Sequence, residues 1–164
     1  MSRTIVFIRH AQAGPGLRDH SRSLTTAGRD QAQEAATKLA TYLTPGARVV
    51  ASSARRTQET AHAIAQQIGS EVESRSELYV GGEDEVIAAT IGAGDVVVVG
   101  HAPVIAYAAI DCASRISPQV AEKVSSQGCP TATAFVFSVP TDEEGADDWG
   151  QAQWVNTLIT PARR

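Results

Sequence analysis

Cysteine is scarce in this sequence: Cys112 and Cys129 are the only two among 164 residues. They form no C-x-x-C pair, no H-x-x-x-H pair exists either, and two isolated thiols are most simply filler in a hydrophobic core. No apolar run approaches the ~18 residues of a membrane span. No secretory signal precedes the first apolar stretch. We therefore expect a reduced, cytoplasmic protein that needs no metal.

Basic charge is also limited, because 14 Lys and Arg face 18 Asp and Glu, for a net charge of −4. This balance argues against nucleic-acid or anionic-membrane binding, which needs a strongly basic face. The first 56 residues nevertheless carry nine basic and only three acidic side chains, and eight of the nine are arginine. Arginine presents a planar fork that matches phosphate. Either a phosphate pocket or a general preference for arginine codons explains this bias.

The chain is long enough for one domain, and we expect residues 1–164 to form it. Apolar runs predict strands at residues 4–8, 49–51, 72–78, 95–100, 132–139 and 153–159. Helical periodicity predicts helices at residues 25–43, 53–68, 83–91, 103–113 and 118–125. This alternation predicts a three-layer α/β/α fold with a mostly parallel sheet, and the continuously β-branched run at 95–100 suits its centre.

Functional residues are expected outside the carboxyl ends of the strands, where open parallel sheets bind ligands. The residues that follow three predicted strands are Arg9 and His10, then Ser52, Ser53, Arg55 and Arg56, then His101. A histidine in such a place is more often structural than catalytic, but two histidines and two arginines together indicate a phosphoryl ligand. The second group also begins a helix, whose N-terminus favours an anion.

Two common routes to phosphate chemistry are excluded by spacing. A cysteine phosphatase needs C-x5-R, yet Pro118 and Phe135 stand six positions after the two cysteines. No GxxxxGK[ST] loop exists. Histidine remains as the nucleophile, since a neutral imidazole can attack phosphorus when nearby cations neutralise the phosphoryl oxygens. Arg9, Arg56 and His101 are candidates for that neutralising role.

These segments resemble a known family. The stretches FIRHAQAG (7–14), SSARRTQETA (52–61) and VVVVGHAP (96–103) are similar to the signature segments of the histidine phosphatase superfamily, with the phosphoglycerate-mutase-like fold. Ala11 stands where the family usually has glycine. The stretch DHSRSLTTAGRDQA (19–32) resembles the D-x-x-R-x-L-T-x-x-G pattern of the small bacterial phosphohistidine phosphatase branch.

The resemblance implies that His10 is the nucleophile, that Arg9 and Arg56 bind the phosphoryl group, and that His101 is the second pocket histidine. Metal and cofactor are implied to be absent. Arg22 matches an additional arginine of the branch, and either touches substrate or pairs with Asp19. The surface is expected to hold the residues without such a role: Arg3, Arg29, Arg48, Arg55, His20, His62, and the acidic loop with Asp147 and Asp148.

One departure bears on mechanism. Many relatives carry a general-acid glutamate in an L-x-E context after the third strand, whereas here Leu78 is followed by Tyr79 and Val80. Glu83 or Asp84 could substitute, or could belong to the acidic first turn of a helix. A site without a strong acid suits a leaving group that departs readily, such as the imidazole of phosphohistidine.

We therefore expect a cofactor-independent hydrolase, a protein phosphohistidine phosphatase with a phosphate ion as pocket ligand. Two alternatives stay open at this point. One is a phosphatase of a small phosphorylated metabolite with Glu83 or Asp84 as acid, and the other is a non-catalytic module that only binds a phosphorylated ligand.

Overall fold

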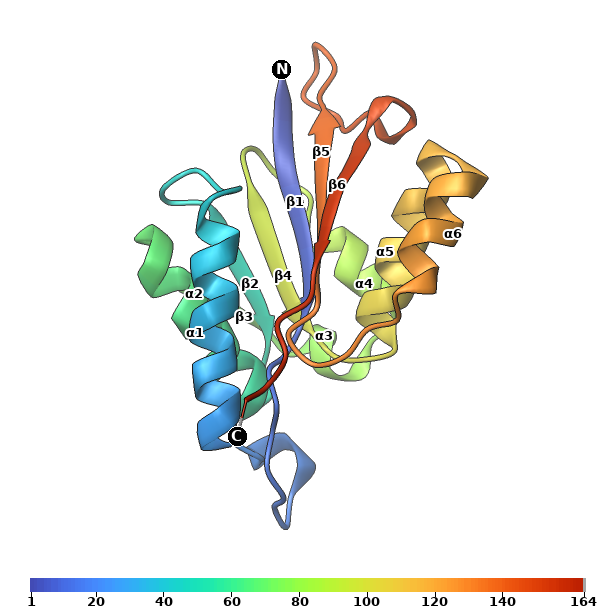
Figure 1. Ribbon diagram of the computed structural model, residues 1–164. Helices are drawn as coiled ribbons and strands as arrows, with labels where there is room; N and C mark the ends of the chain where they lie inside the picture. Colours follow the sequence, from blue (N-terminus) through green and yellow to red (C-terminus); the bar gives the residue numbers. More distant parts are fainter. Residues whose placement is uncertain (164) are drawn as a thin grey trace.

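A six-stranded sheet forms the centre of the molecule in the computed structural model, which describes residues 1–163 (Figure 1). The strands are β1 (Ser2–Arg9), β2 (Arg48–Ser52), β3 (Val72–Arg75), β4 (Val96–Gly100), β5 (Ala134–Pro140) and β6 (Gln153–Leu158). They lie in the order β3-β2-β4-β1-β5-β6. The pairs among β3, β2, β4 and β1 are parallel, while β5 and β6 are antiparallel to their neighbours. The predicted mostly parallel sheet is confirmed.

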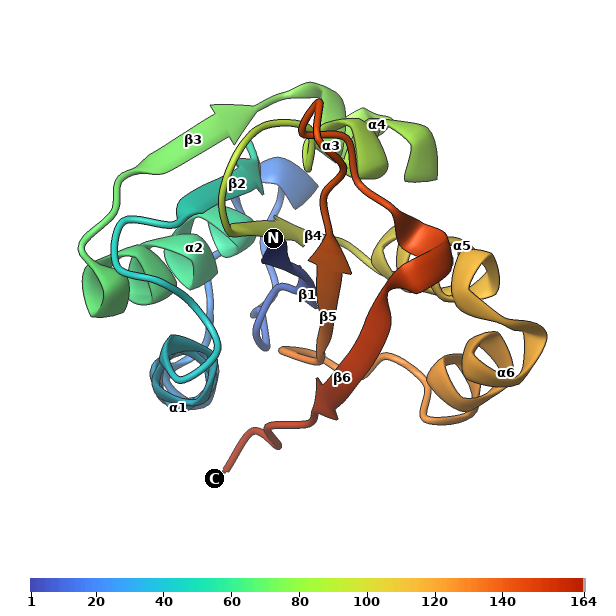
Figure 2. The same cartoon turned by 90° about the horizontal axis from the view of Figure 1, so that it is seen from above.

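Helices cover both faces of this sheet, as Figure 2 shows from above. The helices are α1 (Thr26–Ala40), α2 (Arg55–Ile68), α3 (Glu77–Val80), α4 (Glu83–Ala88), α5 (Val104–Ile116) and α6 (Pro118–Ser126). Side chains alternate along β1, so that Val6 and Ile8 pack toward α1 and α2 while Ile5 and Phe7 pack toward α5. All five residues of β4 are buried, as expected for a central parallel strand. The α/β/α layers are thus confirmed.

Local signals account for several boundaries. Gly69 ends α2 in the left-handed conformation with φ of 71°, which glycine adopts without steric cost. Thr25 caps α1 by accepting a hydrogen bond from the Gly28 N–H. The predicted strand at 72–78 is too long, since β3 ends at Arg75 and α3 begins at Glu77. This helical turn lets Leu78, which is 4% exposed, reach the core.

The prediction that Arg3 and Asp147 are solvated surface charges is wrong. Arg3 is 6% exposed, and its guanidinium binds both carboxylate oxygens of Asp147 at 2.9 and 2.7 Å. It also donates to the carbonyl oxygens of Thr90 and Gly94. A buried arginine requires such a full set of acceptors. Asp148, Arg29 and Arg55 are exposed as expected.

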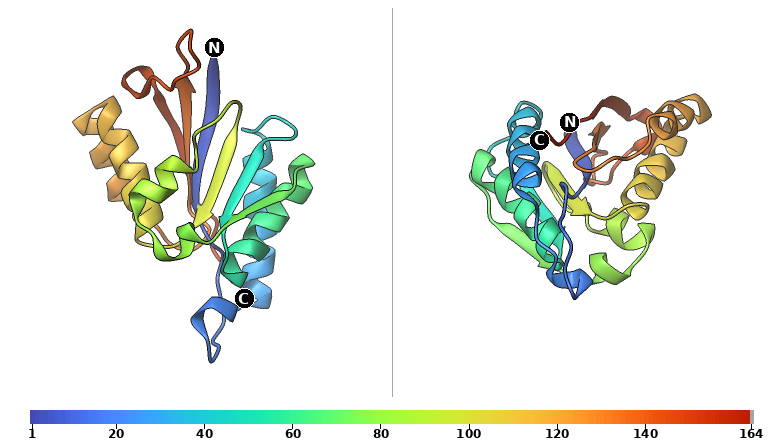
Figure 3. Two further views of the ribbon diagram at one scale, coloured as in Figure 1. Left: turned by 180° about the vertical axis from the view of Figure 1, so that it is seen from behind. Right: turned by 60° about the horizontal axis from the view of Figure 1, so that its bottom comes forward.

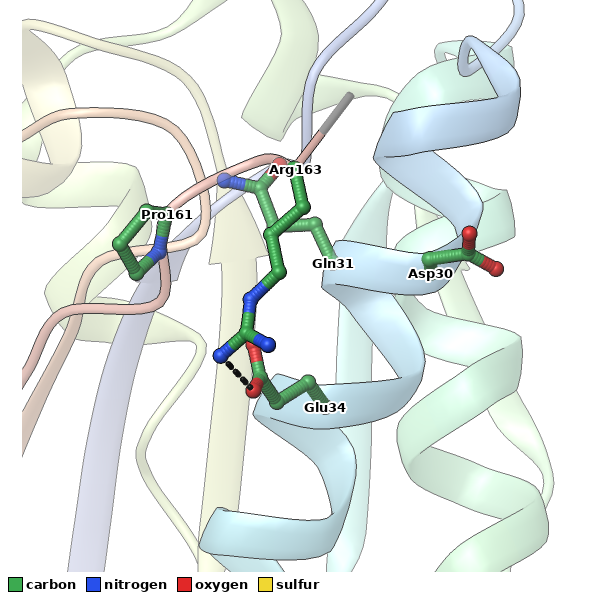
Figure 4. A pocket seen from close by; sticks show the side chains of 5 residues that line it. All are labelled: Asp30, Gln31, Glu34, Pro161 and Arg163. Carbon is green, nitrogen blue, oxygen red and sulfur yellow. Dashed lines mark hydrogen bonds and ion pairs between the residues drawn. The ribbon is translucent and has the colours of Figure 1, made fainter.

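The C-terminal segment runs along α1 (Figure 4). Gln31 donates to the Thr160 carbonyl oxygen at 2.7 Å, and Arg163 pairs with Glu34 at 3.1 Å. Thr160 is buried, so this segment is part of the folded domain. Within residues 1–163, no helix is both long and apolar enough to cross a membrane.

Candidate active site

The carboxyl ends of β1, β2 and β4 bring the sequence-predicted histidines and arginines to one edge of the sheet, which is turned toward the reader in the right panel of Figure 3. Arg9 is the last residue of β1 and pairs in register with Gly100, the last residue of β4. His10 and His101 therefore follow neighbouring strands, and their ring centroids lie 5.5 Å apart. The parallel register is what places the two imidazoles side by side.

His10 is held with one ring nitrogen free. Its side chain is nearly buried, and Nδ1 lies 2.7 Å from the Ala11 carbonyl oxygen, to which it must donate. Nε2 consequently carries the lone pair. Burial lowers the pKa of His10 to about 4; the Ala11 carbonyl opposes this shift, and the charge of Arg56 adds to it. At neutral pH the ring is uncharged and in a fixed tautomer, with a lone pair on Nε2 that is available for nucleophilic attack.

His101 is oriented by a chain of hydroxyl groups. Its Nε2 lies 2.7 Å from Ser52 Oγ, and Ser52 Oγ lies 2.7 Å from Thr57 Oγ1. Thr57 Oγ1 donates its proton to the Ala54 carbonyl oxygen, so Ser52 Oγ must donate to Thr57 Oγ1. Ser52 Oγ then accepts from His101, and His101 Nε2 therefore carries a proton. His101 Nδ1 then faces Arg56 Nη2 at 3.3 Å as an acceptor. Burial, followed by the Arg56 charge, lowers the pKa of His101 to about 4.

Arg9 and Arg56 both carry a buried Nε–H with no hydrogen-bond partner among residues 1–163. Their other nitrogens are anchored: Arg56 donates to the Asp19 carbonyl oxygen at 2.7 Å and to Asp19 Oδ2 at 3.0 Å, and Arg9 donates to the Cys129 carbonyl oxygen at 3.0 Å. An unpaired buried donor is costly. The charges of both guanidinium groups act on His10 and lower its pKa, so the site holds positive charge suited to a tetrahedral oxyanion.

Asp19 lies at the centre of a second set of contacts. Its carboxylate accepts from Arg22 Nη1 at 3.0 Å, from Arg56 and from the Tyr79 hydroxyl at 2.7 Å. The Tyr79 hydrogen bond, then Arg22 and Arg56, hold the pKa of Asp19 well below its usual range. Of the two alternatives for Arg22, the pairing with Asp19 is therefore present, and the Arg22 charge also lowers the His10 pKa.

Glu83 and Asp84 lie away from this cluster. Glu83 lines a surface hollow with Tyr107 and Asp111 of α5, and Asp84 is exposed. Within residues 1–163, neither forms a hydrogen bond or ion pair with His10 or its partners. Both belong to the acidic first turn of α4. Val80 stands at the position of the family's acid and is exposed, and Tyr79 before it donates a hydrogen bond to Asp19.

Sequence reasoning missed the residues that support the loop behind His10. Thr60 Oγ1 accepts from the Ala11 N–H at 3.0 Å, and Gln31 Oε1 accepts from the Gln12 N–H at 2.8 Å. A Cβ at Gly28 would lie 2.0 Å from the Gln12 carbonyl oxygen, so only glycine allows α1 to approach this loop. The glycine of the D-x-x-R-x-L-T-x-x-G pattern was the one available signal. Among residues 1–163, no three His, Cys, Asp or Glu side chains are grouped as metal ligands.

The two pocket histidines are expected to titrate near pH 4 and not near their ordinary 6.5. Because both pKa values are lower in the folded than in the unfolded chain, the unfolded chain binds more protons than the folded chain between about pH 4 and pH 6.5. The stabilisation from neutral His10 and His101 is thus complete above pH 6.5 and is lost as the pH falls toward 4. NMR titration of isotope-labelled imidazoles measures both midpoints.

Assignment of those signals needs His10→Ala and His101→Ala, each of which removes one resonance. A chemical-denaturation series from pH 7 to pH 4 provides the second readout. A midpoint near 6.5 for His10 in the folded protein would contradict the buried, neutral nucleophile.

Comparison with known proteins agrees with this geometry. The sequence model of the histidine phosphatase superfamily (branch 1) matches residues 5–79. A solved structure named as phosphohistidine phosphatase SixA from Nakamurella multipartitia is 30% identical, with 98% of this chain and 97% of that chain covered and a TM-score of 0.81. The SixA protein of Agrobacterium tumefaciens is 23% identical, with coverage of 96% and 97% and a TM-score of 0.74.

More distant relatives share the fold. A phosphoglycerate mutase from Plasmodium falciparum is 22% identical, with coverage of 90% and 87% and a TM-score of 0.57. No curated protein matches the sequence. The full-length match at 30% identity, together with paired histidines and arginines at the ends of β1, β2 and β4, leads to one conclusion. The chain belongs to the histidine phosphatase superfamily.

Proposed function

We propose that the protein hydrolyses phosphohistidine on a partner protein, through a covalent phosphohistidine intermediate on His10. The observation that carries this proposal is the free Nε2 of His10, on a ring held uncharged in a site where Arg9 and Arg56 add positive charge. The proteins named SixA support the substrate class. A further SixA structure, described as a protein histidine phosphatase, is complexed with tungstate, a tetrahedral oxyanion like phosphate.

Phosphoryl transfer then proceeds in two steps. Arg9 and Arg56 neutralise the non-bridging oxygens, neutral His101 holds Arg56 through Nδ1, and the lone pair on His10 Nε2 forms a bond to phosphorus as the substrate P–N bond breaks. Water then attacks phosphorus, and His10 leaves with its electron pair. The Ala11 carbonyl keeps the Nδ1 proton in place throughout. The arginines supply the positive charge, so the proposal requires no cofactor. We also propose that the protein acts in the cytoplasm.

The substrate preference gives a direct test. Phosphate release from a phosphohistidine protein is expected to exceed that from a phosphoserine peptide or a sugar phosphate by about 100-fold or more in kcat/KM, because general-acid catalysis is typically worth at least that factor. No carboxylic acid that contacts the pocket residues is free to protonate an alkoxide: Asp19 is held ionised, and Glu83 faces α5.

Each substrate is assayed at several enzyme concentrations, with and without chelator. The matched control is Glu83→Gln, because a small-metabolite phosphatase that uses Glu83 as acid would lose its ester turnover. Faster turnover of an alkyl ester, abolished in Glu83→Gln, would overturn the proposal. Tight phosphate binding without turnover of any substrate would identify a binding module instead.

A further inference from the structure

Two segments lie beyond the carboxyl ends of the strands, beside the His10 and His101 site, and we call them the entrance to this site (Figure 1). One is the loop after β1, which contains a single 3-10 turn, Asp19–Ser21. The other is α3, which contributes Tyr79. The two segments meet through the hydrogen bond of 2.7 Å from the Tyr79 hydroxyl to Asp19 Oδ2.

Aromatic rings face one another across this entrance. The Tyr79 ring lies 5.6 Å from the His101 ring at 70°, and 4.8 Å from the His20 ring at 89°. His20 Nε2 lies 2.9 Å from Ser53 Oγ, which fixes the outer ring against the start of α2. An edge-to-face pair in contact leaves the outer face of a ring uncovered, and a flat group can pack on such a face.

Asp19 adds a fixed negative charge to the same place. Three donors hold its carboxylate ionised, and about half of the side chain is exposed, at 53%. The Tyr79 proton is already donated to Asp19, and this contact raises the Tyr79 pKa. Neither group is therefore a proton donor toward a substrate. The entrance offers hydrogen-bond acceptors and ring surfaces, which is the opposite of what an alkoxide leaving group needs.

We propose that Asp19 and Tyr79 form a subsite for the leaving imidazole ring of a phosphohistidine substrate. This subsite rests on the proposed function above. The ring packs against Tyr79, and the ring nitrogen that does not carry phosphorus donates its N–H to the exposed carboxylate oxygen of Asp19. The carboxylate favours the protonated, cationic ring, as charge-assisted hydrogen bonds do.

The chemistry balances without an added proton. His10 Nε2 supplies an electron pair to phosphorus, and the substrate P–N bond breaks with its electron pair going to the substrate ring nitrogen. Because the other nitrogen already holds a proton, the ring departs as neutral imidazole. Asp19 therefore removes the need for a general acid by selecting the substrate form that needs none. An alkyl ester has no such second nitrogen and gains nothing from Asp19.

The decisive variant is Asp19→Asn, assayed with a phosphohistidine protein and with p-nitrophenyl phosphate, whose leaving group departs without protonation. We expect kcat/KM for phosphohistidine to fall about tenfold or more, as the loss of a hydrogen bond to a charged group implies. The aryl ester should fall by a smaller factor, because it makes no such bond and loses only the support that Asp19 gives to Arg56. Tyr79→Phe, which removes one hydrogen bond to Asp19, should lower the ratio of kcat/KM for phosphohistidine to kcat/KM for the aryl ester by a smaller factor.

Glu77→Gln, at an exposed acid on the same helix as Tyr79, is the matched control and should leave both substrates unchanged. An equal fall for the two substrates in Asp19→Asn would overturn the subsite, since Asp19 would then act only by placing Arg56. A wild-type enzyme that shows no preference for phosphohistidine would overturn the proposed function itself. The two failures are thus distinguishable from the same set of assays.

Discussion

His10→Ala is expected to lower phosphate release from a phosphohistidine protein by about 10⁴-fold or more, because removal of a nucleophile abolishes the covalent route. The structure gives the reason at atomic level: Nε2 is the one unprotonated ring nitrogen of His10, and the charges of Arg9 and Arg56 act on the same ring. No other described side chain combines a free lone pair with that setting. The measurement is phosphate release, together with trapping of the phosphorylated enzyme under alkaline conditions, because phosphohistidine is labile in acid and stable in alkali.

A chelator is included in each assay, and the activity is expected to be unaffected by it, since the arginines neutralise the phosphoryl oxygens. His62→Ala is the matched control, because His62 is an exposed histidine on α2 outside the pocket. It should retain full activity. Phosphoenzyme that still forms in His10→Ala would show that another residue is the nucleophile.

The ends of parallel strands explain why much of this site could be predicted from the sequence. His10 and His101 each follow a short apolar run directly, and Arg56 begins the helix after another. Strand and helix signals place such residues within one or two positions, and the parallel register then brings them together. The same reasoning placed β4 at the centre of the sheet, where it lies.

Contacts between distant loops explain what the sequence did not predict. Asp19 meets Tyr79 across 60 positions, and Arg3 meets Asp147 across 144. Neither pair has a local pattern, because each partner alone is an ordinary polar residue of a turn or strand end. His20 was assigned to the surface and is indeed exposed, yet it lies against Tyr79 at the entrance. Such roles depend on how loops fold back, which short-range periodicity does not encode.

Substitution of Arg56 is the second large effect we expect. Arg56→Ala should lower kcat/KM for phosphohistidine about 10³-fold, at the upper end for loss of one preorganised donor to a developing charge. Arg56 is 6% exposed and joins three parts of the site: its charge acts on His10, Nη2 faces His101 Nδ1, and the guanidinium donates to both the carbonyl and the carboxylate of Asp19. Its loss removes charge and geometry together.

Arg56→Lys separates those two contributions. Lysine keeps the positive charge but lacks the fork that binds Asp19 at two points, so about tenfold of the loss should be recovered and no more. Arg55→Ala is the control, because its neighbouring guanidinium is exposed and pairs only loosely with Glu59 at 3.8 Å; it should stay within about twofold of wild type. Thermal unfolding of each variant tests whether the fold survives. Full activity in a folded Arg56→Ala protein would contradict the role of Arg56 as the second cation that binds the phosphoryl group.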